Sequence, residues 1–312
     1  MSLVVTGSIG IDTIIGPHGT VENVMGGSAS YFAAAAGFFC PVRLVAAVGD
    51  DWPADHSALL SRFEQIDTAG LEERAGSKTF RWTGKYHEDM NIRETMAVDI
   101  GVLAEEIPPV PPAFADSRLV FLANTDPINQ LKFAGQFAHA DLIVADTMDR
   151  WIETQPADLE ALLATIHGLV INDSEAAMLV PEAANTIVAA KAIQRRYDLG
   201  FVVVKKGEHG AILVHRDGLA VLPSYPADQV IDPTGAGDTF AGGFMGYLAC
   251  SAGDYSVETL QRAMAYGTVV ASFTIESFSL DRLAGLTRQE IDDRLAEMAR
   301  IVRISMPAAA EA

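Results

Sequence analysis

Short apolar runs, many of them β-branched, alternate along this chain with longer amphipathic segments, and this alternation constrains the fold more than any other feature. Strands that each precede a helix form a parallel sheet with helices on both faces, because every crossover must pass over the sheet. The expected strands are residues 3–9, 42–48, 119–123, 142–145, 169–171 and 201–205. The expected helices are residues 28–39, 53–63, 130–139, 152–166, 184–197 and 235–250. We therefore predict an α/β three-layer sandwich with a mostly parallel central sheet and a ligand site at the carboxyl ends of its strands.

Two segments interrupt the alternation. Residues 13–24 are punctuated by glycine and proline and lack a helical period. Residues 79–86 and 92–98 have the character of two strands around a polar turn, with aromatic side chains at even spacing in the first. We predict that they form a small β lid, from about residues 13–24 and 77–100, inserted into a single α/β domain of residues 1–312. An edge hairpin that only extends the sheet is the alternative.

The charge balance excludes two classes of partner. The chain has 22 basic and 41 acidic residues, which gives a net charge of −19. A field of that sign repels phosphate backbones and anionic lipid, so we expect no nucleic-acid partner and no membrane partner. One small anionic ligand, held by a local cluster of donors, remains compatible with it.

Composition and cysteine use predict a globular protein of the cytoplasm. Apolar residues make up 49% of the 312 residues, enough for a sizeable core. Cys40 and Cys250 fit no metal-binding spacing and suit reduced thiols in a reducing compartment. No Lys or Arg precedes Arg43, which argues against a basic signal or transit peptide. The longest apolar stretch, residues 29–42, is shorter than the ~20 residues that span a bilayer.

The segment DPTGAGDTF, residues 232–240, carries the most chemical information. Apolar residues recur at helical spacing after it, so it opens a helix. Gly235 and Gly237 then lie where the first helical amides have no intrahelical partner, and the missing Cβ atoms let an anion approach those amides. Asp238 lies in the first turn, beside this anion site rather than within it.

Phosphoryl transfer requires this combination of groups. The amides hold the charge of the transferred group, and a carboxylate accepts the proton of the attacking hydroxyl. The competing interpretation is structural, with a carboxylate stabilising a helix N-terminus and glycines forming a tight turn. The chain contains no GxxxxGK[ST], GxGxxG, HExxH or GxSxG pattern, which excludes the P-loop, dinucleotide, zinc-protease and esterase signatures.

The same nine residues resemble the C-terminal signature of the ribokinase-like sugar and nucleoside kinases, the phosphofructokinase B type. Further segments match that family in order along the chain from residue 3 to about residue 303. They are the first strand with Asp12, the glycine pair Gly26-Gly27, VGDD at residues 48–51, NDSE at residues 172–175 and KGEHG at residues 206–210. The resemblance implies the ribokinase-like fold and ATP-dependent transfer of a phosphoryl group to an alcohol.

The resemblance also assigns roles to individual residues. Asp238 is implied as the general base, and the anion hole is implied at Gly235, Ala236 and Gly237. Nucleotide contacts are implied for Asn172, Lys206, Gly207 and Thr234, together with Gly235 and Gly237. Acceptor contacts are implied for Asp12, Gly26, Gly27 and Asp238. Glu175 is implied to hold Mg²⁺ through water, and Asp232 and Thr234 correspond to positions near a monovalent cation, K⁺. From the residues alone, Asn172 and Glu175 equally fit a helix cap with an acidic first turn.

One position departs from the family pattern. Four residues after Gly27 the family has an asparagine that contacts a sugar hydroxyl, and this chain has Tyr31. We expect Tyr31 to face the acceptor pocket; the alternative is that it points into the core. The predicted function is an ATP-dependent kinase that phosphorylates a hydroxymethyl group of a small sugar. Two alternatives stay open, a nucleoside kinase of the same family and a catalytically silent ligand-binding protein. A homodimer through the lid is compatible with each.

Overall fold

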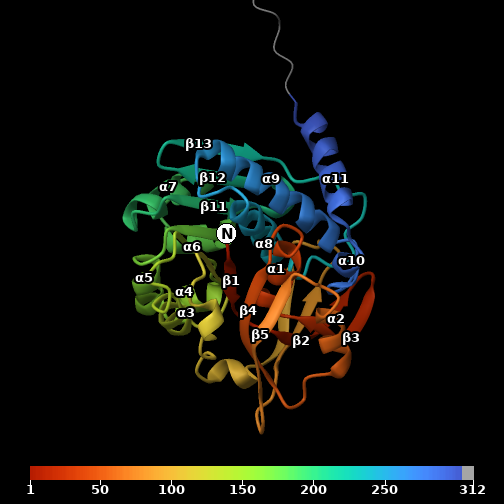
Figure 1. The fold of residues 1–312 in the computed structure, drawn as a ribbon. Coiled ribbons are helices and arrows are strands. Elements are labelled where there is room, and N and C mark those ends of the chain that lie inside the picture. The colour runs from red at the N-terminus through yellow and green to blue at the C-terminus, as the bar shows by residue number, and fades with distance from the viewer. Residues whose placement is uncertain (304–312) are drawn as a thin grey trace, which may run out of the picture.

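A nine-stranded sheet forms the centre of the protein in the computed structural model, which describes residues 1–303 (Figure 1). Its strand order is β13-β12-β11-β10-β9-β8-β1-β4-β5, and all neighbours are parallel except at β12, which runs antiparallel to β11 and β13. The strands are β1 (Leu3–Thr6), β4 (Val42–Gly49), β5 (Ile66–Arg74), β8 (Leu119–Leu122), β9 (Leu142–Ala145), β10 (Gly168–Asn172), β11 (Phe201–Lys205), β12 (Ala211–His215) and β13 (Gly218–Leu222).

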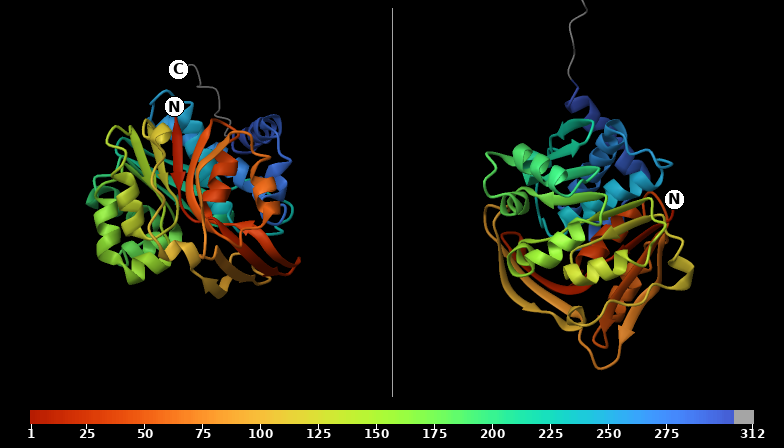
Figure 2. Two further views of the ribbon diagram at one scale, coloured as in Figure 1. Left: turned by 60° about the horizontal axis from the view of Figure 1, so that its bottom comes forward. Right: turned by 90° about the vertical axis from the view of Figure 1, so that its left-hand side faces the viewer.

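Helices cover both faces of this sheet, as Figures 1 and 2 show. They are α1 (Ser28–Ala36), α2 (Ala54–Leu60), α3 (Pro127–Ala134), α4 (Asp149–Thr154), α5 (Pro156–Leu163), α6 (Asp173–Leu179), α7 (Thr186–Arg196), α8 (Ala236–Ala249), α9 (Val257–Thr274), α10 (Asp281–Ala284) and α11 (Arg288–Ile301), with 3-10 turns at Gly101–Ala104, Pro112–Phe114 and Gly207–His209. No helix among residues 1–303 combines the length and the apolar character that a membrane crossing requires.

Successive side chains of each central strand point to opposite faces of the sheet, so each strand contributes to two cores. In β1, Leu3 and Val5 pack with α1, α8 and α9, whereas Val4 packs with α3, α5 and α7. All three side chains are fully buried. Both faces of the strand are therefore covered, which gives the three layers that the alternation of strands and helices predicted.

A second sheet of four strands, in the order β3-β2-β6-β7, lies along one edge of the molecule (Figure 2, left). Its strands are β2 (Gly10–Gly16), β3 (Gly19–Gly26), β6 (Phe80–Tyr86) and β7 (Arg93–Asp99). The predicted lid segments, residues 13–24 and 77–100, lie largely within it. The sheet is joined to the main domain at β1 and α1, so its first two strands are fixed at the base by buried elements. Whether it closes over a ligand stays a prediction.

Several elements differ from the sequence-based expectation. The single helix expected over residues 152–166 is two helices, α4 and α5. Pro156 has no amide hydrogen to donate within a helix, so α4 ends before it and α5 begins at it. The edge strand β5 was not predicted, since most of its side chains are polar and exposed. The hairpin of β12 and β13 and the helices α9 and α11 were not among the expected elements either.

Candidate active site

The predicted site residues meet where the carboxyl ends of the central strands face the second sheet. Asn172 ends β10 and Lys205 ends β11, and the two are paired in the parallel ladder. Asp146 directly follows β9, one strand further along the sheet. Parallel strands bring their carboxyl ends to one edge, so these three polar side chains leave the sheet close to the N-terminus of α8.

The N-terminus of α8 is built as the sequence predicted. Gly235 is the N-cap residue, with a left-handed φ of 72°, and it supplies no side-chain cap to the first turn. The Ala236 amide donates to the Pro233 carbonyl at 3.1 Å, whereas the Gly235 and Gly237 amides have no backbone acceptor among residues 1–303. Of the three residues predicted to form the anion hole, Gly235 and Gly237 therefore have amides available to an anion, and the role itself stays a prediction. The left-handed conformation belongs to Gly235 and not to Gly237, so a strained turn at Gly237 is not part of the site.

Asp238 is half-buried in the first turn of α8. Burial raises the pKa of its carboxyl, and the positive charges of Lys205 and Arg93 oppose that rise. Asp146, which is 4% exposed, has its pKa raised by burial and then by the neighbouring charge of Asp238. A general base with a raised pKa titrates closer to neutral pH, where proton transfer from an alcohol is most effective.

Asp12 lies on β2 in the second sheet and is 3% exposed. A Cβ atom on Gly26 would lie 1.9 Å from its Oδ2, so only glycine at this position leaves room for the carboxyl. Burial, followed by the charges of Asp232 and Asp238, raises the pKa of Asp12 to about 8. Its Oδ1 has no hydrogen-bond partner among the described residues. A buried acceptor of this kind is suited to bind a ligand hydroxyl.

Tyr31 lies between these groups, buried to 1% exposure. A Cβ on Gly235 would lie 2.3 Å from the Cγ of its ring, so the phenol packs directly against the N-cap of α8. Its hydroxyl is buried without a partner among residues 1–303, and the charges of Asp232 and Asp12 help to raise its pKa. The side chain of Tyr31 is therefore part of the core, and its contact with an acceptor stays a prediction.

The face of the second sheet that carries Asp12 also carries aromatic side chains. Trp82 is paired with Asp12 in the ladder between β2 and β6, so the two side chains leave the sheet on the same side. The indole of Trp82 extends along this face over Gly84, where a Cβ would lie 1.8 Å from its Cη2. Tyr86, two residues further, accepts a 3.1 Å hydrogen bond from the Thr234 hydroxyl. The aromatic face is thus in direct contact with the segment that precedes α8.

The base and the tip of this sheet are anchored to the main domain. Asp51, the last residue of the VGDD segment, accepts hydrogen bonds from the Thr79 amide at 2.7 Å and from Arg81 at 3.1 Å. At the tip, Asn91 Oδ1 would lie 3.2 Å from a Cβ on Gly207, which has a φ of 52°. The β6–β7 turn therefore reaches the loop after β11, where nucleotide contacts were predicted.

Asn172 and Glu175 form a capping box at the start of α6. Asn172 Oδ1 accepts from the Glu175 amide, and Glu175 Oε2 accepts from the Asn172 amide, both at 2.8 Å. The helix-cap interpretation is therefore correct, and the phosphate and metal roles stay predictions. Glu175 is 7% exposed, and burial raises its pKa. Within the described part of the chain, no three His, Cys, Asp or Glu side chains converge as a set of metal ligands.

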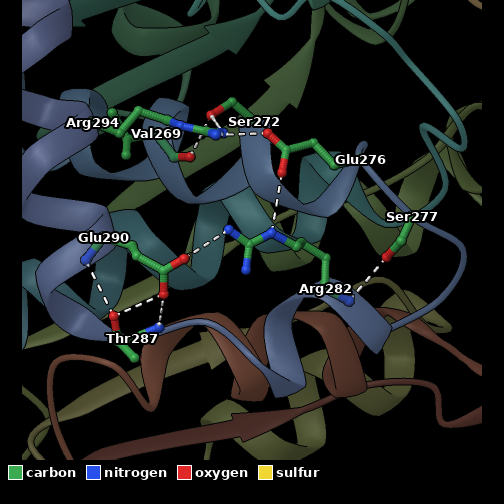
Figure 3. Close-up of polar contacts among 8 residues, drawn as sticks. All are labelled: Val269, Ser272, Glu276, Ser277, Arg282, Thr287, Glu290 and Arg294. Carbon is green, nitrogen blue, oxygen red and sulfur yellow. Dashed lines mark hydrogen bonds and ion pairs between the residues drawn. The ribbon is translucent and has the colours of Figure 1, made fainter.

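Asp232 is held by the loop that follows α9. The amides of Ile231 and Asp232 both donate to the Ile275 carbonyl, at 2.8 and 3.3 Å. Asp232 Oδ1 accepts from the Thr234 amide at 2.9 Å, whereas the buried Oδ2 has no partner among residues 1–303. The loop is fixed by an ion-pair network, in which Glu276 binds Arg282 and Arg294 (Figure 3).

The remaining predicted residues occupy the edges of the site. Gly27 is the N-cap of α1, next to Gly26 at the end of β3. Lys206 contributes its backbone, whose amide donates to the Gly210 carbonyl at 2.7 Å. The lysine whose side chain lies beside the first turn of α8 is its neighbour Lys205, which the sequence analysis did not single out; its Nζ would lie 2.9 Å from a Cβ on Gly237. Its signal was a charged residue at the carboxyl end of a buried strand, where the parallel-sheet rule places ligand sites.

Comparisons with known proteins identify the family and the fold. A profile of the family described as pfkB family carbohydrate kinase matches residues 2–283. A cytidine kinase of Thermococcus kodakarensis is 29% identical over 251 residues, which are 78% of this chain and 87% of that protein. The solved nucleoside kinase of Burkholderia thailandensis in complex with inosine has a TM-score of 0.77 at 20% identity, with 95% of this chain and 98% of that chain covered. A putative ribokinase II of E. coli in complex with ATP and Mg²⁺ has a TM-score of 0.76 at 16% identity and covers 95% of this chain and 99% of its own. The predicted ribokinase-like fold is confirmed.

Proposed function

The chain belongs to the pfkB family of carbohydrate kinases, and from this premise we propose that it phosphorylates the hydroxymethyl group of a nucleoside. As a member of that family it is an ATP-dependent phosphotransferase that acts on a hydroxyl group. The sequence analysis favoured a small free sugar as acceptor and kept a nucleoside as the alternative. The groups on the second sheet support the nucleoside.

The observation that carries the proposal is the pairing of Trp82 with Asp12 on one face of the second sheet. A nucleoside presents ribose hydroxyls, which a buried carboxyl binds, and a flat base, which an indole stacks on. Trp82 is only partly buried, and the Arg93 guanidinium lies over its ring, 5.8 Å from the centroid. A stacked base would take the place of this guanidinium. The cytidine kinase named above is consistent with such an acceptor, although its substrate is a property of that protein.

In the proposed reaction Asp238 takes the proton of the ribose hydroxyl as that oxygen attacks the γ-phosphorus of ATP. The bond from this phosphorus to the β–γ bridging oxygen breaks, and ADP leaves. The amides of Gly235 and Gly237 hold the charge on the transferred group, since they have no backbone acceptor among residues 1–303 and the dipole of α8 favours anions. The Ala236 amide would join them by sharing the proton that it donates to the Pro233 carbonyl. Asp12 positions the ribose through its hydroxyls. Thr234 is linked to Tyr86, so the acceptor side and the nucleotide side are joined by one hydrogen bond.

The chain also offers groups that fit the two expected cations. Glu175 uses Oε2 in the capping box, which leaves Oε1 for a water of hydrated Mg²⁺. The buried, unpartnered Oδ2 of Asp232 beside the Ile275 loop fits a weakly hydrated cation such as K⁺. When bound, Mg²⁺ would neutralise the phosphates. We expect turnover to require Mg²⁺ and to rise when K⁺ replaces a large organic cation in the buffer.

The deciding experiment measures ADP release with a panel of nucleosides and free sugars, for the wild type and Trp82→Leu. We expect a nucleoside to give the highest kcat/KM, and Trp82→Leu to raise the nucleoside KM about tenfold while the KM for ATP is unchanged. Trp52→Leu is the matched control, because Trp52 is also a partly buried indole and packs edge-on against His56 of α2. Preference for a pentose or hexose would favour the small-sugar alternative. ATP binding without turnover of any acceptor would favour the catalytically silent protein.

Two further expectations, a reducing compartment and a homodimer through the second sheet, stay predictions. Cys40 and Cys250 are both free thiols, in keeping with a reducing cytoplasm. The outer strand β7 exposes Met96 and Val98, which are 52% and 46% exposed, and it lies at the edge of its sheet. A homodimer through this sheet would cover them, and sedimentation of the wild type against Met96→Glu would detect it.

A further inference from the structure

We propose that Arg93 covers the open face of the Trp82 indole in the free protein and leaves it when an acceptor with a flat ring binds. Arg93 is thereby a specificity-determining residue of the acceptor site. The inference rests on the proposed function, because it takes Trp82 as the stacking partner of a nucleoside base. It adds that a side chain of the protein itself occupies the place of the base until the base arrives.

The indole of Trp82 has a single face that a ligand can reach. Its Nε1 donates a 3.2 Å hydrogen bond to Thr95 Oγ1 on the neighbouring strand, which fixes the direction of the ring along the sheet. One face of the ring lies on Gly84, since a Cβ there would lie 1.8 to 2.5 Å from the ring atoms Cη2, Cζ2 and Cζ3. Gly84 is accordingly buried. The opposite face of the indole is therefore the one on which a base could stack.

The guanidinium of Arg93 lies over this same face. Its Cζ is 5.8 Å from the centroid of the Trp82 ring, and the backbone at Gly84 covers the other side. Arg93 is paired with Tyr86 in the ladder between β6 and β7, so the two side chains leave the sheet on one side. Tyr86 contacts Thr234 from that side. The guanidinium therefore lies on the side of the sheet that faces the main domain.

The surroundings of Arg93 leave it free to move. Burial raises the pKa values of Asp238 and Glu175, and the positive charge of Arg93 is among the influences that oppose this rise, so the guanidinium lies near the site. Among residues 1–303, however, no carboxylate lies within the 4.0 Å of an ion pair with it. Arg93 is exposed, and it can leave the indole without breaking an ion pair.

The strengths of the two stacking contacts decide which group occupies the ring. A guanidinium over an exposed indole gains about two- to fivefold in the equilibrium constant, whereas a base stacked on an aromatic side chain gains about 5- to 150-fold. A base therefore displaces Arg93, and the displacement cancels part of its gain. A free sugar binds at Asp12 through its hydroxyls and leaves the arginine in place. Arg93 thus weakens the binding of flat-ringed acceptors alone and excludes those that stack poorly.

The test measures, by calorimetry without ATP, the dissociation constants of a panel of nucleosides and of free ribose. We expect Arg93→Met to bind nucleosides about two- to fivefold more tightly than the wild type, with the affinity for ribose unchanged. In a Trp82→Leu background the same substitution should change neither affinity. Lys85→Met is the matched control, because it removes one positive charge from the opposite face of β6.

An unchanged or weaker nucleoside affinity in Arg93→Met overturns the proposal, because the guanidinium then does not compete with the base. An equal gain for ribose, or for Lys85→Met, also overturns it, since the effect would then come from the lost charge. A nucleoside that the wild type phosphorylates but whose affinity ignores Arg93→Met refutes this inference alone. Nucleosides that bind Arg93→Met more tightly without being phosphorylated by either protein refute only the proposed function. If no nucleoside binds either protein, both are refuted.

Discussion

The buried carboxyl of Asp12 allows one prediction to be worked out in full. We expect Asp12→Asn to stabilise the ligand-free protein at pH 8 and to leave its stability almost unchanged at pH 4. The side chain is 3% exposed, and its pKa is raised from 3.8 to about 8 by burial and by the charges of Asp232 and Asp238. Asparagine has nearly the same shape and carries no charge at any pH.

The sign follows from proton binding in the two states. Between about pH 4 and pH 8 the folded protein keeps the Asp12 proton, whereas the unfolded chain has lost it. Unfolding therefore releases a proton, and stability falls as the pH rises through this window. At 1.36 kcal/mol per pKa unit, the rise of the Asp12 pKa can lower the free energy of unfolding by at most about 6 kcal/mol. Because Asp232 and Asp238 also have raised pKa values and share the protonation, we expect about 2–4 kcal/mol at pH 8.

The assay is urea unfolding of the wild type and Asp12→Asn at half-unit steps from pH 4 to pH 8, without nucleotide or acceptor. The difference in unfolding free energy should grow with pH, while the variant's KM for the acceptor rises sharply. Asp55→Asn, exposed on α2, is the control and should show no such pH-dependent gain. A stability difference that is constant across the pH range would refute the reasoning, because it would mean that Asp12 is ionised in the folded protein.

Five further predictions concern the site and the second sheet. Asp238→Asn should lower kcat by about 10²–10⁴-fold with the dissociation constant for ATP nearly unchanged, as measured by ADP release and calorimetry. Gly235→Ala should cost about 2–5 kcal/mol in urea unfolding, because it combines a left-handed φ of 72° with a contact 2.3 Å from a buried tyrosine ring. Gly237→Val should abolish turnover with little loss of stability, since its nearest neighbour is the movable end of a lysine; turnover near the wild-type rate would exclude an anion hole there. Tyr31→Phe should raise stability by about 1 kcal/mol, because it removes a buried hydroxyl without a partner. Hydrogen exchange in residues 80–99 should slow when the acceptor binds, and no added protection would argue against a closing lid.

The sequence was most informative where one physical pattern determines the structure. The central strands are apolar on both faces, as in Leu3–Thr6, and such runs between helices have few alternatives to a parallel sheet. The start of α8 was predictable for the same reason, because glycines followed by a helical apolar face fix an N-terminus. In β5 the buried face is reduced to a few residues, so its polar sequence gave no strand signal.

The parts of the site that were missed depend on directions that only the assembled fold defines. Lys205 and Lys206 are adjacent and chemically alike. Which of the two side chains lies beside the N-terminus of α8 depends on how α8 is placed against the end of β11. The two expectations for Tyr31 could not be separated either, because its ring and its hydroxyl lie in different environments. The sequence does contain the apolar spacing of α11, at Ile291, Leu295 and Met298, although it was not used.

The division of the site between two sheets has a consequence for how such an enzyme can change. Asp12 and Trp82 belong to the four-stranded sheet, whereas Asp238 and Lys205 belong to the main domain. On the roles proposed above, the choice of acceptor and the transfer chemistry are encoded in separate pieces of the chain, which contact each other through Asp51 and through Tyr86 and Thr234. Substitutions in one piece can accumulate while the other stays intact. Exchange of the small sheet between relatives is therefore a direct route to a kinase with a new acceptor and an inherited rate of phosphoryl transfer.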